Sequence, residues 1–214
     1  MYLFLDTETT GLPRSWRAPV SELENWPRLV QIAWARFDAR HRHLQTKACI
    51  VRPEGFTIPR EAQRVHGIST KRAIAEGRPL PGVLRRFAAA AAKARVVVAH
   101  NLRFDEAVIA AEFLRLGLGV PLAGKRRVCT MLEATDYCGI PSWRGYKWPT
   151  LSELHASLFG LELEEAHNAE ADVTTCAKCF FELKRRRIIK MSSGRVKRWR
   201  GPGFEGGRRF HRLP

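Results

Sequence analysis

Two acidic side chains follow the first apolar segment of the chain. Tyr2–Leu5 is a continuous apolar run, as expected of a strand buried on both faces. Asp6 follows it directly and Glu8 comes two residues later, so strand periodicity places both carboxylates on one face. Two such carboxylates repel each other and cost free energy to bury, and a divalent cation between them would offset both costs. An exposed turn ending at Gly11 is the alternative interpretation.

Two further acids fall on the apolar faces of predicted helices. Asp105 shares a helix face with Val108 and Ile109, and the preceding strand places it at the sheet edge where α/β proteins usually bind ligands. An acid that only favours the helix dipole is the alternative for Asp105. Asp172 lies near the start of the last predicted helix. Apolar residues follow it at helical spacing, namely Cys176, Cys179 and Leu183.

The four acids share a predicted inward orientation, and their oxygen ligands suit Mg²⁺ or Mn²⁺ rather than zinc. Four carboxylates are about the number that holds two such ions on either side of a phosphodiester, where one ion activates water and the other stabilises the leaving oxygen. His167, just before the last helix, would then be the general base for the water. Beside Asn168, a good N-cap residue, a lone histidine is more often a capping or packing residue.

The remaining pattern indicates an α/β fold with a mixed sheet, because early strands are followed by alternating strands and helices. Arg14–Pro27 is predicted to be a surface loop, which leaves its two tryptophans, Trp16 and Trp26, unexplained. Further strands are expected at Leu29–Phe37, Leu44–Val51, Val96–Ala99 and Arg126–Val128. Helices are expected at Pro59–Val65, Leu80–Lys93, Leu102–Leu116, Leu151–Leu158 and Asn168–Arg187.

Three short motifs, in this order, resemble the exonuclease motifs of the DEDDh superfamily. They are Asp6-x-Glu8, His100-Asn101-x-x-Phe104-Asp105 and His167-x-x-x-x-Asp172. His66-Gly67-Ile68 resembles a further element of that superfamily. The similarity covers about residues 1–187, and the most similar members are expected among the proofreading epsilon subunits of bacterial replicative DNA polymerases and their stand-alone homologues.

This resemblance implies a ribonuclease H-like α/β fold, with a mixed five-stranded sheet flanked by helices. It implies a metal-dependent 3′→5′ exonuclease that releases nucleoside monophosphates from nucleic-acid 3′ ends, with DNA as the expected substrate in proofreading or repair. Two Mg²⁺ or Mn²⁺ ions would be held by Asp6, Glu8, Asp105 and Asp172, with His167 as the base. The residues expected to contact the terminal nucleotide are Thr9, Leu12, His66 and Phe104, with Leu12 wedged against its base.

The formal net charge of +16 favours a polyanionic partner, either nucleic acid or an acidic membrane surface. From Lys184 onward the chain has twelve basic residues and a single acid, Glu205. We therefore expect an exonuclease domain over residues 1–187 and a basic, flexible tail over 188–214. The expected partner is the 3′ end of single-stranded DNA, and a polymerase or other replication partner stays open.

The alternatives within nucleic-acid proteins are an RNA-trimming exoribonuclease and a binding module without catalysis. A membrane-surface protein is least favoured, because the tail has no sustained amphipathic pattern. No apolar run approaches the roughly 18 residues of a membrane span, and no signal-peptide pattern begins the sequence, so a cytoplasmic protein is expected. Five cysteines at scattered positions argue against a disulfide framework, and the Cys176/Cys179 pair favours core packing over zinc.

Overall fold

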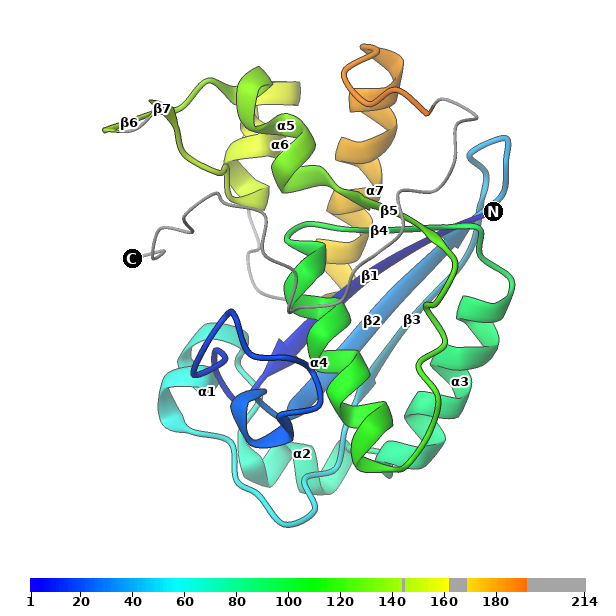
Figure 1. Ribbon diagram of the computed structural model, residues 1–214, viewed down its shortest axis with the longest axis vertical. Helices are drawn as coiled ribbons and strands as arrows, with labels where there is room; N and C mark the ends of the chain where they lie inside the picture. Colours follow the sequence, from blue (N-terminus) through cyan, green and yellow to red (C-terminus); the bar gives the residue numbers. More distant parts are fainter. Residues whose placement is uncertain (144, 162–168, 192–214) are drawn as a thin grey trace.

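A mixed five-stranded sheet forms the centre of the protein, as a computed structural model that describes residues 1–143, 145–161 and 169–191 shows (Figure 1). The strand order is β3-β2-β1-β4-β5. Strand β2 pairs antiparallel with both β1 and β3. Strand β4 pairs parallel with both β1 and β5. This sheet confirms the predicted fold class. The strands are β1 (Tyr2–Thr9), β2 (Leu29–Phe37), β3 (His43–Ile50), β4 (Val96–Ala99) and β5 (Arg126–Cys129).

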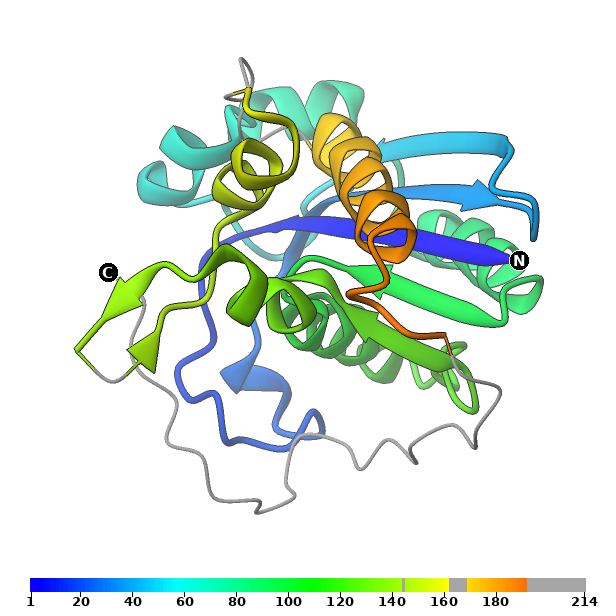
Figure 2. The ribbon, with the colours of Figure 1, turned by 90° about the horizontal axis from the view of Figure 1, so that it is seen from above.

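Helices cover both faces of this sheet, because β1 is apolar on both of its faces. Leu3 and Leu5 point into a core formed with α3 (Leu80–Ala92) and α4 (Leu102–Arg115). Tyr2 and Phe4 point the opposite way, toward α5, α6 and α7. Figure 2 shows the two helical layers from above. The second layer consists of α5 (Thr130–Cys138), α6 (Leu151–Phe159) and α7 (Ala169–Arg185).

Two short helices and a small hairpin complete the described chain. Helices α1 (Arg60–His66) and α2 (Thr70–Glu76) follow β3, and a small hairpin pairs β6 (Pro141–Ser142) with β7 (Gly145–Tyr146). The sequence pattern did not predict α2, α5 or this hairpin. No helix within the described residues is both long and apolar enough to span a membrane. The predicted basic tail lies outside the described residues from residue 192 onward.

Arg14–Pro27 is a loop with many exposed residues, as predicted, but two of its side chains pack against the body of the protein. The segment contains a short 3₁₀ helix, η1 (Leu23–Asn25), and it packs against α4. Trp26 is buried with Val20 against alanines of α4, where small side chains let the loop approach closely. Trp16 lies beside Phe104, with ring centroids 5.8 Å apart. The two tryptophans therefore anchor the loop to the helix that carries Asp105.

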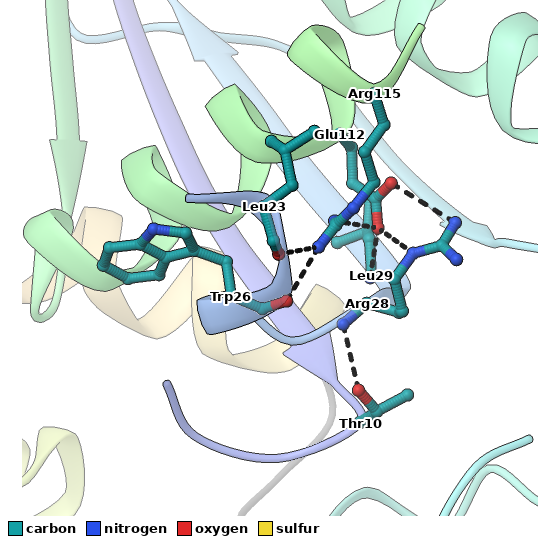
Figure 3. Close-up of polar contacts among 7 residues, drawn as sticks. All are labelled: Thr10, Leu23, Trp26, Arg28, Leu29, Glu112 and Arg115. Atoms are coloured by element: carbon teal, nitrogen blue, oxygen red, sulfur yellow. Dashed lines mark hydrogen bonds and ion pairs between the residues drawn. The ribbon is translucent and has the colours of Figure 1, made fainter. Parts of the chain in front are cut away.

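A buried carboxylate holds this loop and the start of β2 to α4 (Figure 3). Glu112 accepts a hydrogen bond from the backbone N–H of Leu29 at 2.9 Å and pairs with Arg28 Nε at 3.0 Å. Arg115 lies 3.1 Å from the same carboxylate and also donates to the backbone carbonyls of Leu23 and Trp26. The charge on Glu112 is thus matched by two guanidinium groups and one backbone N–H, which is what burial of a charged group requires.

We expect Glu112→Ala to lower the free energy of unfolding by about 3–5 kcal/mol, because it leaves two arginines without their buried partner. The matched control is Glu76→Ala, which removes an ion pair of the same 3.0 Å length, to Arg72, from the protein surface. Exposed pairs contribute little, so this control should barely change stability. Urea unfolding of both variants checks the difference, and equal midpoints would contradict the role assigned to Glu112.

Candidate active site

Three of the four predicted acids converge at the end of β1. Asp6 and Glu8 lie on the same face of this strand, as strand periodicity predicts, and Asp172 approaches them from the first turn of α7. Each of the three offers a carboxylate oxygen, and these oxygens lie within 4.8 Å of one another. All three side chains are half-buried, so they are partly accessible to solvent. An oxygen cluster of this size fits a hard divalent cation such as Mg²⁺ or Mn²⁺.

Asp105 reaches the same strand from the opposite helical layer. The last residue of β1 that pairs with β4 is Phe4, so the second half of β1 runs past the end of β4, where α4 begins. There Thr7 donates a hydrogen bond from its hydroxyl to Asp105 Oδ1 at 2.8 Å. Asp105 is 3% exposed and lies outside the 4.8 Å group, although its charge acts on Asp6.

Crowding and burial shift the acids strongly toward their protonated forms. Burial raises the pKa of Asp6 well above its usual value, and the charges of Asp105, Glu8 and Asp172 add to the effect. Burial and then Asp172 raise the pKa of Glu8 to about 7. For Asp105 burial raises the pKa to about 8, against the opposing hydrogen bond from Thr7. A bound divalent cation would stabilise the ionised forms and reverse these shifts.

The residues expected to contact a terminal nucleotide lie around this cluster, but in different surroundings. Thr9 is buried, and its hydroxyl donates to the Gly11 carbonyl at 2.6 Å. His66 is 8% exposed and lies near the Thr9 backbone, and its Nε2 atom has no hydrogen bond of normal geometry within the described chain. Leu12 is 69% exposed, whereas Phe104 is half-buried beside Trp16. The predicted general base, His167, lies outside the described residues.

A buried polar chain that the sequence did not reveal links the end of β4 to the layer of α5, α6 and α7 beside the cluster. His100 Nε2 lies 2.9 Å from the Pro149 carbonyl, which can only accept, so this nitrogen carries the proton. His100 Nδ1 then accepts from the Thr130 hydroxyl at 3.0 Å. Burial lowers the pKa of His100 to about 4, which keeps the ring neutral. Cys176, one turn after Asp172, lies 3.7 Å from the same hydroxyl. The only sequence signal was the place of His100 in its motif.

The sequence matches the family model RNase_T, described as exonuclease, over residues 3–180. The chain therefore belongs to this exonuclease family. That membership confirms the DEDDh superfamily predicted from the motifs and the enzyme class, a phosphodiester-cleaving exonuclease. None of the curated proteins matched the chain.

Solved structures of exonuclease I share the fold. The E. coli enzyme in complex with a dT13 oligonucleotide is 22% identical, with a TM-score of 0.69, and the match covers 87% of this chain and 41% of that chain. The zinc-ion-bound complex of the E. coli enzyme with single-stranded DNA gives the same four values. A dA16 complex is 21% identical with a TM-score of 0.66, over 87% and 41% of the two chains. This chain thus spans less than half the length of these structures.

The shifted carboxyl groups predict an unusual pH dependence for the metal-free protein. The pKa of Glu8 rises from 4.5 to about 7 on folding and that of Asp105 from 3.8 to about 8, so the folded state binds more protons between these values. Stability contributed by these groups is fully present below pH 3.8 and is lost as the pH rises to about 8. Urea unfolding in chelator should therefore show falling stability across this range.

The variant Glu8→Gln cannot ionise at that position, so its stability should fall less steeply with pH. Glu133→Gln, an exposed acid on α5, is the matched control and should follow the wild type. Identical slopes for all three proteins would show that Glu8 is not held in a crowded, desolvated site.

Proposed function

We propose that this protein is a metal-dependent 3′→5′ exonuclease that releases nucleoside monophosphates from single-stranded DNA. The observation that carries the proposal is the convergence of Asp6, Glu8 and Asp172 within 4.8 Å, with Asp105 held against the same strand by Thr7. Without a cation, crowded carboxylates would repel the phosphates of a nucleic acid, so a surface that only binds nucleic acid gains nothing from them. Membership of the exonuclease family supports the same conclusion.

The proposed roles follow the chemistry of each group. Asp6, Glu8, Asp105 and Asp172 would hold two Mg²⁺ or Mn²⁺ ions. When bound, such ions lower the barrier by activating water and by stabilising the leaving oxygen of a phosphodiester. His167 would take the proton from the attacking water. Thr9, Leu12, His66 and Phe104 would contact the terminal nucleotide, and its polar atoms offer a partner for the buried Nε2 of His66.

DNA is the proposed substrate because the solved structures of similar fold are described as complexes with dT13, dA16 or single-stranded DNA. A role in DNA proofreading or repair, with a replication partner, is the setting that we propose for it. An RNA-trimming activity is the second candidate, since the carboxylate cluster would act on the phosphodiester that DNA and RNA share. The outcome depends on contacts to the 2′-hydroxyl, the group by which proteins tell RNA from DNA.

The test uses single-stranded DNA and RNA of one sequence, each labelled at the 5′ end, with Mg²⁺, with Mn²⁺ and with chelator. We expect the labelled DNA to shorten stepwise from its 3′ end in either metal and to stay intact in chelator. Faster shortening of the RNA would favour the RNA-trimming candidate. Binding of DNA without any cleavage in either metal would contradict the proposed function.

In the same assay His167→Ala should lower turnover by about 10²–10⁴, the usual contribution of one general base. Its thermal stabilisation by Mn²⁺ should persist, because His167 is not among the proposed metal ligands. The comparison variant is His155→Ala, a half-buried histidine on α6 outside the proposed site, which should keep full turnover. A fully active His167→Ala would rule out the proposed base.

A further inference from the structure

A second binding region adjoins the carboxylate cluster. A cavity of about 490 Å³ lies between the Arg14–Pro27 loop and Phe56, and Thr10 and Leu12 form part of its wall. Thr10 follows Glu8 by two residues, so their Cα atoms are at most about 7 Å apart. The cavity therefore begins next to the site where a phosphodiester would be cleaved. Its volume is in the range of ordinary ligand pockets.

The charged groups of this cavity are mainly cationic. Three arginines line it, Arg14, Arg28 and Arg115, against a single lining acid, Glu24. Arg28 and Arg115 are fixed by the buried Glu112, as Figure 3 shows. Within the described chain the Arg14 side chain has no hydrogen bond or ion pair, so it alone among the three is free to bind an anion.

The cavity is also lined by a guanidinium group and an aromatic ring, two groups on which a nucleic-acid base can stack. The guanidinium carbon of Arg28 lies 4.4 Å from the centre of the Phe56 ring. Bases stack both on aromatic rings and on arginine planes, and this works with every base. Leu12, which is 69% exposed, lines the same cavity. A free arginine beside a stacking surface matches the two repeating parts of a single strand, phosphate and base.

We propose that this cavity binds the nucleotide on the 5′ side of the cleaved bond, with its phosphodiester on Arg14 and its base against the Arg28–Phe56 pair. The inference rests on the proposed function, since a 3′→5′ exonuclease has a single nucleotide on the 3′ side of that bond. The rest of the strand must then leave the cluster on the 5′ side, and the cavity adjoins the cluster directly. The Arg14–Pro27 loop thereby becomes a substrate-binding element.

The test compares Arg14→Glu with Arg17→Glu. Arg17 belongs to the same loop and is exposed, but it does not line the cavity, so both variants change the charge of the loop equally. The first readout is the affinity for an octanucleotide of thymidylate with chelator present. Arg14→Glu should weaken binding about tenfold relative to Arg17→Glu, since one charge-assisted phosphate contact is lost and reversed. Arg14→Lys, which keeps the charge, should restore most of the affinity.

The second readout is cleavage of the octanucleotide and of a thymidylate dinucleotide in Mg²⁺. Arg14→Glu should raise KM for the octanucleotide with kcat nearly unchanged, and it should reduce the advantage of the longer substrate over the dinucleotide. Equal behaviour of the two charge-reversal variants would overturn the subsite, and so would absence of octanucleotide binding by the wild type. If the wild type binds but cleaves neither substrate, the proposed function fails, whereas the binding comparison still decides whether the cavity holds nucleic acid.

Discussion

The repulsion among carboxylates at the end of β1 is the constraint on which the rest of the structure depends. Asp6, Glu8 and Asp172 lie within reach of a single ion, and Asp105 is buried beside them. In the absence of a cation, burial and mutual repulsion favour protonation of these groups, so the arrangement opposes folding at neutral pH. The sheet and its two helical layers must supply the stability that keeps the acids together.

The architecture meets this demand by fixing each acid through a different element. β1 is clamped between two apolar cores, and its second half runs past β4, which leaves room for α4 to bring in Asp105. Thr7 holds that carboxyl group in place, while α7 carries Asp172 on a helix whose next turns are buried. Glu112 ties the loop after β1 to α4. The same loop then borders both the cluster and the neighbouring cavity.

The sequence predicted most of the sheet and the long helices because their apolar patterns are distinct, as in the continuous apolar run that begins β1 and the amphipathic helix α3. It missed α2, which is short, and α5, which follows β5 without a polar break. Strand periodicity placed Asp6 and Glu8 correctly on one face. The separation of Asp105 from the other three depends on where β4 ends relative to β1, which no local pattern encodes. The burial of Trp26 likewise depends on small residues of α4, distant in sequence.

These carboxylates should together form a divalent-cation site, and calorimetric titration of the metal-free protein with Mn²⁺ tests this most directly. The wild type should bind Mn²⁺ saturably near neutral pH and release protons as it does so, because the ligands must ionise. Asp172→Asn, which removes one member of the 4.8 Å group, should bind much more weakly. Saturable binding of equal strength in Asp172→Asn, or no binding by the wild type, would contradict the account.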